Sequence, residues 1–394
     1  MKKWLYALIG LLSMLLAGFI YAWSILSAPI AADFPDWAGP AFSFTFTLCM
    51  IFFCLGSILA GLLARRTPMQ RSLLLAGVLF VVGFLISGRA NALWQLYAGY
   101  GVCAGLASGL AYGAIMAIVP RHFPERPGLI SGVLLMGFGA SSLIIGSVFT
   151  AMSEPPASWR NAMLVFGAVI GAVLILAGLL LREADVRSGA ARVSDSERDY
   201  TPGQMTRTLP FWLLICWTIL LAGLGLAVIG QARGLLLSVQ NTLSPARVSL
   251  FVGLISVCNG LGRLLFGALY DALGWRKTIL CISGTSLLGA IMLTLALRGS
   301  AALVVAAFCV IGLGYGGAPT FNAAVTKRFY GDSYYPINFP IVNLNLLVSA
   351  FVPTLVSAVV TSSGSYGKAG LLLIAMAALS FPFALLIKKP SRSF

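Results

Sequence analysis

Arg263 is the residue with the clearest chemical potential, because it lies well inside the apolar stretch 248–270. Placing an arginine near the middle of a membrane helix costs about 2.5–3.5 kcal/mol, so such a residue is by default a functional candidate. The planar guanidinium can bind a carboxylate through two parallel hydrogen bonds. The sequence therefore predicts an anion site at Arg263, with a structural role, bonded to helix carbonyls or to Asn259, as the alternative.

The positions of the acidic residues support the prediction of an anion site. All 11 Asp and Glu residues lie at the ends of apolar stretches or in loops, so Arg263 has no evident counter-ion in the chain. A substrate anion could supply that charge. Arg233 follows the apolar stretch 208–232 near its outer end, where it either binds or gates an anion or extends its charge to the membrane surface.

Polar side chains within other apolar stretches could orient the rest of a small ligand. Each could instead bond a neighbouring helix. The candidates are Tyr21, Trp23, Tyr112, Asn259, Tyr315, Asn322, Asn343 and Asn345.

Other chemistry has little support in the sequence. The seven cysteines all lie in apolar stretches without a CxxC pair, and the single histidine, His122, lies in a loop. These cysteines are typical of small buried apolar residues. We expect no metal site, no cofactor and no enzymatic activity.

The composition predicts the elements that must position Arg263. Hydrophobic residues make up 59% of the 394 residues and charged residues 9%, whereas soluble domains are about 25% charged. Long apolar runs favour membrane helices over a β-barrel. We predict an all-α membrane protein of twelve spans: 248–270, and eleven charge-free stretches at 4–32, 37–64, 72–88, 90–120, 127–153, 161–181, 208–232, 278–297, 299–326, 333–367 and 369–387.

The basic residues predict the orientation. With the N-terminus inside, nineteen of the 26 Lys and Arg residues fall on the cytoplasmic side and five on the other side. The positive-inside rule then places both termini in the cytoplasm of a multi-pass protein of the cell membrane. The net charge of +15 therefore needs no nucleic-acid partner; the lipid bilayer is the expected partner, and a monomer is expected.

An internal repeat divides the chain. The polar segment 182–208 reads as a cytoplasmic linker between residues 1–181 and 209–394. Gly61 and Gly267, which follow the second and eighth spans, are 206 residues apart, and Arg121 and Lys327 have the same offset. We therefore predict two pseudo-symmetric six-helix bundles.

The segment after the eighth span carries a first resemblance. Gly267-xxx-Asp271-xx-Gly274-x-Arg276-Lys277 resembles the loop signature of the major facilitator superfamily. The resemblance implies that Asp271 and Arg276 belong to a charged latch that holds one access state closed. The copy after the second span has Arg65 where the acid is expected.

Further motifs resemble the oxalate/formate antiporter family, which is related to the monocarboxylate transporters. They are Tyr21-Ala-Trp23, Arg121-His-Phe-Pro124-Glu125-Arg126-Pro-Gly128, Asn259-Gly-x-Gly262-Arg263 and Gly314-x-Gly316-Gly317. The resemblance implies alternating access and assigns anion binding to Arg263. It also implies a lysine in the eleventh span of the oxalate exchanger, where this chain has apolar residues around Leu346.

One membrane cation suits one carboxylate better than two. We therefore expect a small monocarboxylate of the lactate, pyruvate or formate type, with an oxalate or dicarboxylate exchanger and a multidrug exporter on the same fold as alternatives. Because no carboxylate lies deep in a span, exchange, uniport and proton transfer carried by the substrate all remain open.

Overall fold

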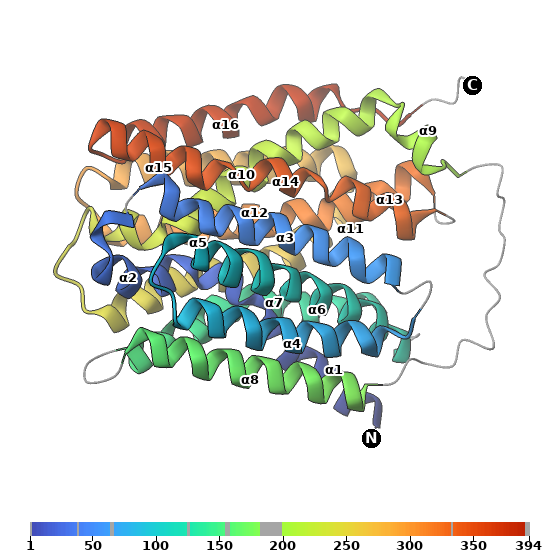
Figure 1. The fold of residues 1–394 in the computed structure, drawn as a ribbon. Helices are drawn as coiled ribbons and strands as arrows, with labels where there is room; N and C mark the ends of the chain where they lie inside the picture. Colours follow the sequence, from blue (N-terminus) through green and yellow to red (C-terminus); the bar gives the residue numbers. More distant parts are fainter. Residues whose placement is uncertain are drawn as a thin grey trace.

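The computed structural model describes residues 2–37, 39–63, 67–123, 127–153, 158–181, 199–331 and 334–390. All the regular elements in these ranges are helices, and they form one elongated bundle (Figure 1). The all-α class predicted from composition is confirmed.

Six spans form the first part of the chain, and two of them combine several elements. The first span contains the 3-10 turn η1, and the fourth contains the π-helical segment η3. The elements are α1 (Lys2–Ala17), η1 (Gly18–Ala22), α2 (Trp23–Asp33), η2 (Pro35–Trp37), α3 (Pro40–Leu63), α4 (Met69–Gly88), α5 (Leu93–Leu96), η3 (Tyr97–Ala104), α6 (Gly105–Ile118), η4 (Pro120–His122), α7 (Pro127–Ser153) and α8 (Trp159–Leu180).

The second part begins with a short helix and has one broken span. This broken span is the eleventh crossing of the chain, and it consists of three consecutive helices, α13, α14 and α15. The elements are α9 (Pro202–Thr206), α10 (Leu209–Leu237), α11 (Pro245–Ala296), α12 (Ala301–Tyr330), α13 (Tyr335–Val342), α14 (Asn345–Ser349), α15 (Val352–Ser363) and α16 (Gly367–Leu386).

The described residues contain 11 helical segments long and apolar enough to span a membrane, and α11 accounts for the twelfth crossing. At 52 residues, α11 would be ~78 Å long as one helix, more than twice the hydrocarbon thickness. It is broken at Gly274, where φ is 75° and ψ is 168°. Glycine tolerates this conformation because it has no Cβ. The chain thus reverses between two spans at the predicted boundary.

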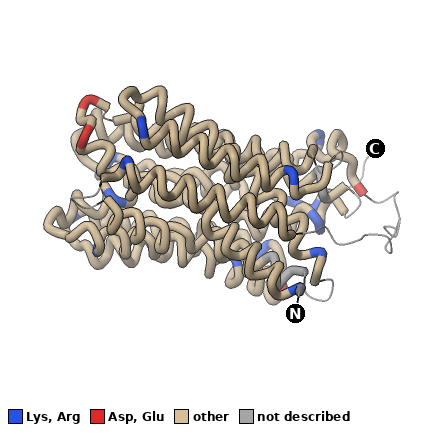
Figure 2. Tube along the Cα trace, turned by 60° about the horizontal axis from the view of Figure 1, so that its bottom comes forward, with Lys and Arg blue, Asp and Glu red and all other residues tan. Residues whose placement is uncertain are grey.

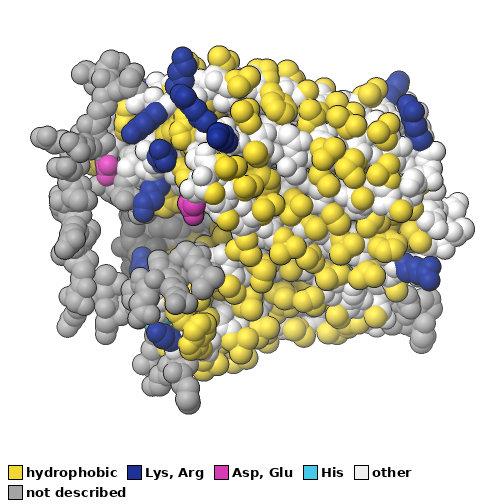
Figure 3. All heavy atoms as spheres, turned by 180° about the vertical axis from the view of Figure 1, so that it is seen from behind, with side chains coloured by type: hydrophobic (Ala, Val, Ile, Leu, Met, Phe, Trp, Pro, Cys, Tyr) yellow, Lys and Arg dark blue, Asp and Glu magenta, His cyan; other side chains and the backbone are white. Residues whose placement is uncertain are grey.

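The bundle has two ends that differ in what they carry. Both chain termini lie at one end, which we call the terminal face, and the opposite end is the distal face (Figure 1). Most coloured charged residues lie toward these two ends (Figure 2). Between the ends, hydrophobic side chains cover much of the visible surface (Figure 3). This distribution is that of a multi-pass membrane protein.

Helices from the two parts of the chain meet along the bundle. Helix α7 packs against α11, α3 packs against α14 and α15, and α2 packs against α10. The first part of the predicted linker, residues 182–198, lies outside the described residues. Its last part contacts the second half of the chain: the Tyr200 backbone N–H donates to Tyr330 O at 2.9 Å, and Asn338 Nδ2 donates to Tyr200 O at 2.9 Å. The domain limits at 181 and 209 stay a prediction.

Close contact between α11 and α12 depends on Gly316. A Cβ at this position would overlap the carbonyl oxygen of Asn259, which belongs to the backbone and cannot move aside independently. In α11, Gly284 has open space where its Cβ would be. The two positions therefore offer a matched test of this packing.

Gly316→Ala should destabilise the protein by about 1–3 kcal/mol, because the added methyl forces α11 and α12 apart. Gly284→Ala should change stability by less than about 1 kcal/mol, toward stabilisation, because alanine favours a helix. Thermal unfolding of the purified protein in detergent measures both. Equal melting temperatures for the two variants would contradict the packing argument.

Candidate functional site

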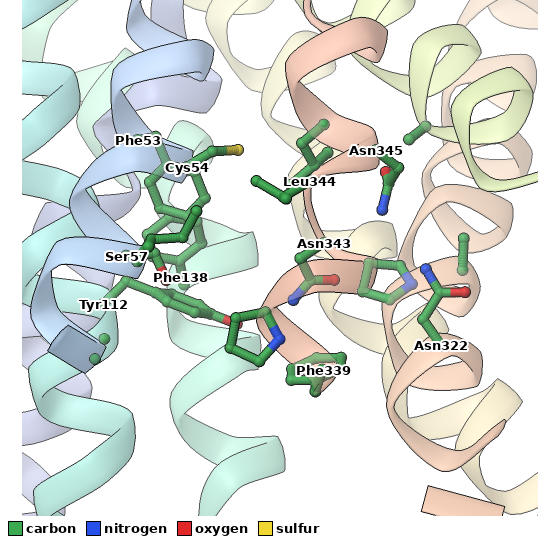
Figure 4. Close-up of a pocket in the computed structure, with 18 of the residues that line it drawn as sticks. Phe53, Cys54, Ser57, Tyr112, Phe138, Asn322, Phe339, Asn343, Leu344 and Asn345 are labelled. Atoms are coloured by element: carbon green, nitrogen blue, oxygen red, sulfur yellow. The ribbon is translucent and has the colours of Figure 1, made fainter. Parts of the chain in front are cut away.

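A cavity of about 350 Å³ lies between the two parts of the chain. Its walls come from η1, α3, α6 and α7 on one side and from α10 to α14 on the other. In Figure 4, Phe53, Tyr112 and Phe138 stand on one wall, and Asn322, Asn343 and Asn345 stand on the other. The sequence-predicted residues that line it are Tyr21, Tyr112, Arg263, Tyr315, Asn322, Asn343 and Asn345.

Arg263 provides a buried positive charge in this cavity. Its side chain is 7% exposed, and its Nε has no hydrogen-bond partner among the described residues. The Tyr112 hydroxyl lies within interaction range of the guanidinium, and so does the phenol of Tyr315. Among the acidic residues that the structure describes, Asp33, Asp36, Asp199 and Asp271, none lines the cavity. Among the residues that the structure describes, Arg263 therefore has no carboxylate counter-ion.

Tyr21 reaches this position because the first span is interrupted. The 3-10 turn η1 leaves helix carbonyls without their usual partners, and serines of neighbouring helices supply them. Ser108 Oγ donates to Ala17 O at 2.6 Å, and Ser141 Oγ donates to Gly18 O at 2.5 Å. The break is thus held in place, and the Tyr21 side chain lies beside Tyr315, with ring centroids 6.3 Å apart.

An aromatic wall faces the polar side of the cavity. The rings of Phe53, Tyr112 and Phe138 are in mutual contact, with centroid separations between 5.3 and 5.6 Å. Tyr21 contacts Phe138 at 5.5 Å. These packed rings give the site a rigid, low-polarity boundary that strengthens electrostatic interactions within it. Sequence reasoning missed Phe53 and Phe138, since nothing local distinguishes them among 24 phenylalanines.

Amide side chains and one hydroxyl form the opposite wall. Asn322 of α12 accepts a hydrogen bond from Thr218 of α10 at 3.1 Å. Asn345 Nδ2 donates to Val342 O at 2.7 Å, across the break between α13 and α14. Asn343, within that break, lines the cavity as well. Thr218 carried no sequence signal, because a threonine in an apolar helix usually bonds its own backbone, as it also does here with Leu214 O at 2.8 Å.

Two predicted contacts lie away from the cavity lining. Trp23 is 2% exposed and packs against Tyr100 and Phe42, with centroids 4.7 and 5.3 Å away. Asn259 is fully buried, and neither polar atom of its side chain has a hydrogen-bond partner among the described residues. Neither residue lines the cavity. A binding role for these two side chains stays a prediction that the geometry of the cavity does not support.

The predicted gating residues also lie outside the cavity lining. Arg233 is half-buried near the distal end of α10. Asp271 is exposed near the terminal end of α11 and forms no salt bridge with a described residue, while Arg276 stacks on Trp275 at 5.2 Å. In this structure the described residues therefore form no charged latch at Asp271.

The cavity is closed on its distal side by neutral hydrogen bonds between the two parts of the chain. Thr47 Oγ1 donates to Ala350 O at 2.7 Å and lies 2.7 Å from Thr354 Oγ1. Between α7 and α11, the Thr150 and Ser249 hydroxyl oxygens are 2.5 Å apart. Gln231 Nε2 donates to Ser43 Oγ at 3.2 Å.

On the terminal side the lining continues to the helix ends. Gly61, Met69 and Arg121 line the cavity there. Arg121 is an exposed cation at this end. In the sequence it belongs to the internal repeat and to the family motif, and it was not among the predicted site residues. The cavity is thus directed toward the terminal face. Among the described residues, no group of three or more His, Cys, Asp and Glu side chains could hold a metal ion.

Comparison with known proteins gives evidence on the family of this chain that is independent of the cavity geometry. The family model of the Major Facilitator Superfamily matches residues 6–335. Three curated relatives cover most of the chain. An uncharacterized MFS-type transporter, YhjX of Escherichia coli, is 26% identical, covering 87% of this chain and 84% of its own. The oxalate:formate antiporter of Oxalobacter formigenes is 24% identical, covering 86% and 80%. Human monocarboxylate transporter 12 is 24% identical, covering 90% and 74%.

A solved transporter structure has a similar fold. The D-xylose–proton symporter superposes with a TM-score of 0.76 at 16% identity and covers 97% of both chains.

Proposed function

Because this chain belongs to the Major Facilitator Superfamily, we propose that it transports small monocarboxylates, of the lactate, pyruvate or formate type, by alternating access. The observation that carries the proposal is Arg263, a buried cation whose cavity has no acidic lining residue among those described. Two relatives are named as an oxalate:formate antiporter and a monocarboxylate transporter. Both names support a small carboxylate as the substrate, and the second supports a monocarboxylate.

The binding step follows from charge and geometry. A carboxylate entering from the terminal face can accept two hydrogen bonds from the Arg263 guanidinium. The Tyr112 hydroxyl, which lies beside that group, can donate a third. The aromatic wall of Phe53 and Phe138 excludes water from the other side, which strengthens the ion pair.

The same charge favours exchange over uniport. Sealing the empty cavity would leave a bare guanidinium away from water, which is costly, whereas the carboxylate-bound pair carries no net charge. The loaded carrier therefore changes access state more readily than the empty one. A substrate that arrives as the neutral acid would not give this neutralisation. We propose anion exchange as the transport mode.

The orientation and the assembly follow the sequence arguments. We place the terminal face in the cytoplasm of the cell membrane, because most basic loop residues lie at that end. The carrier then faces the cytoplasm in the present structure. We propose that it works as a monomer in the lipid bilayer, without a cofactor.

One observation favours a dicarboxylate as the second candidate. Arg121 is a further cation in the cavity lining, at its terminal end. It is exposed to solvent, where its interaction with an anion is screened. We therefore rank a dicarboxylate below a monocarboxylate. A multidrug exporter for cations has less support, because no acidic residue among those described lines the cavity.

Arg263→Gln should lower carboxylate affinity by about 30-fold or more, since losing one partner of a buried charge pair costs about 2–5 kcal/mol. Arg263→Lys should also be impaired, because an ammonium lacks the planar fork. Uptake of labelled lactate, pyruvate and formate into proteoliposomes measures this. Arg298→Gln, an exposed arginine at the distal face, is the matched control. Full uptake by both Arg263 variants with intact folding would refute the proposal.

Thr47→Cys combined with Thr354→Cys should form a disulfide under oxidation, because the two hydroxyl oxygens are only 2.7 Å apart. The cross-link would hold the distal side closed, so exchange should stop and should recover on reduction. Each single cysteine variant under the same oxidant is the control. Undiminished exchange in a fully cross-linked sample would contradict the proposal that the contact between Thr47 and Thr354 must open during transport.

A further inference from the structure

We propose that the cavity contains a second, uncharged subsite, formed by Asn322 and Asn343, that binds a hydroxyl, carbonyl or amide group at the far end of the transported carboxylate. The inference rests on the proposed function, because Arg263 must hold the carboxylate end. Within the proposed class of small monocarboxylates, it favours longer members with a neutral polar tail over formate, lactate and pyruvate.

The broken eleventh span creates this subsite. Four consecutive residues, 343–346, line the cavity. A regular helix turns about 100° per residue and cannot present four successive side chains to one side. Here the backbone between α13 and α14 tightens, because Leu344 N–H bonds Ile341 O at 3.2 Å and Leu346 N–H bonds Asn343 O at 3.1 Å. Irregular backbone at membrane depth is tolerated where it lines a cavity.

Asn345 holds this break, and Asn343 is left for a ligand. Asn345 uses its Nδ2 to satisfy Val342 O, so it acts as a positioning residue. Asn343 makes no side-chain hydrogen bond with the described residues, and Figure 4 shows its amide projecting into the cavity toward the Tyr112 wall. An amide with unused donors and acceptors in a cavity is suited to a neutral polar ligand group.

Asn322 also has hydrogen-bonding capacity to spare. The Thr218 hydroxyl lies 2.8 Å from Leu214 O and 3.1 Å from Asn322 Oδ1, but its single proton serves one acceptor at a time. In either orientation of the Asn322 amide, at least one of its two polar ends is not used by Thr218. Asn322 is only 1% exposed, so a ligand group bonded there would be shielded from water.

The distance along α12 from the Arg263 end of the cavity to Asn322 indicates the ligand length. Tyr315, near Arg263, and Asn322 both lie on α12, seven residues apart, which corresponds to ~10 Å along the helix. The side chains shorten this gap, but a ligand that contacts both ends needs a chain of several atoms. Formate, lactate and pyruvate are too short to bridge them, so these acids would occupy only the Arg263 end. A second carboxylate at the amide end would be desolvated without a cation, which is costly.

The experiment measures binding to the full-length protein in detergent by calorimetry, with matched pairs of probes. The pairs are butyrate with 4-hydroxybutyrate and hexanoate with 6-hydroxyhexanoate; adipate tests a second charge. For at least one pair, the hydroxylated acid should bind about threefold to tenfold more tightly, as expected for one or two neutral hydrogen bonds. Adipate should bind more weakly than 6-hydroxyhexanoate.

Asn343→Leu and Asn322→Leu should abolish the preference for the hydroxylated acid, measured as the ratio of the affinities for 6-hydroxyhexanoate and hexanoate in the same variant. Asn241→Leu, an exposed amide near the distal face, is the control and should keep the preference. If a leucine variant fails to fold, Asn343→Ala and Asn322→Ala replace it. Equal affinities for both members of each pair, or a preference that survives in the Asn343 and Asn322 variants, would overturn the inference.

Arg263→Gln separates this inference from the proposed function. If carboxylate binding depends on Arg263 but shows no hydroxyl preference, only the amide subsite is wrong. If the wild-type protein and Arg263→Gln bind every probe equally well, the proposed function fails, and the amide subsite fails with it.

Discussion

A buried guanidinium with no carboxylate partner among the described residues is the constraint around which the cavity is arranged. Arg263 is nearly inaccessible, and none of the described acidic residues lines its cavity. A charge in this setting is costly unless something of opposite sign arrives. The surrounding tyrosine hydroxyls and packed rings do not neutralise it, but they form a rigid boundary of low polarity beside which an incoming anion would interact strongly.

Interrupted helices deliver the polar groups to this site. The first span breaks at η1, which brings Tyr21 to the cavity, and the eleventh breaks between α13 and α14, which exposes Asn343. Each break leaves backbone carbonyls that need donors. Ser108, Ser141 and Asn345 supply them, so the irregular backbone costs little within the membrane.

The two ends of the bundle differ in the contacts that join the two parts of the chain. On the distal side, hydroxyl and amide groups such as Thr47 and Gln231 join the two parts of the chain. On the terminal side, Asp271 is exposed without a salt bridge to a described residue. Neutral hydrogen bonds of this kind contribute modestly one by one, about 0.5–1.5 kcal/mol each. A contact built from a few of them can open and close without a large barrier, which is what the proposed alternating access would need.

The sequence by itself determined the spans, the reversal near Gly274 and the intramembrane position of Arg263, because hydropathy and charge are properties of each residue in the chain. Only the tertiary structure decided which polar side chains share a cavity. Tyr21 lines it while Trp23 packs against Tyr100, and Asn322 lines it while Asn259 does not. Phe53 and Phe138 were not predictable, since a phenylalanine facing lipid and one facing a cavity look the same in sequence. The rotation and breaks of each helix depend on packing against distant helices, which local pattern does not encode.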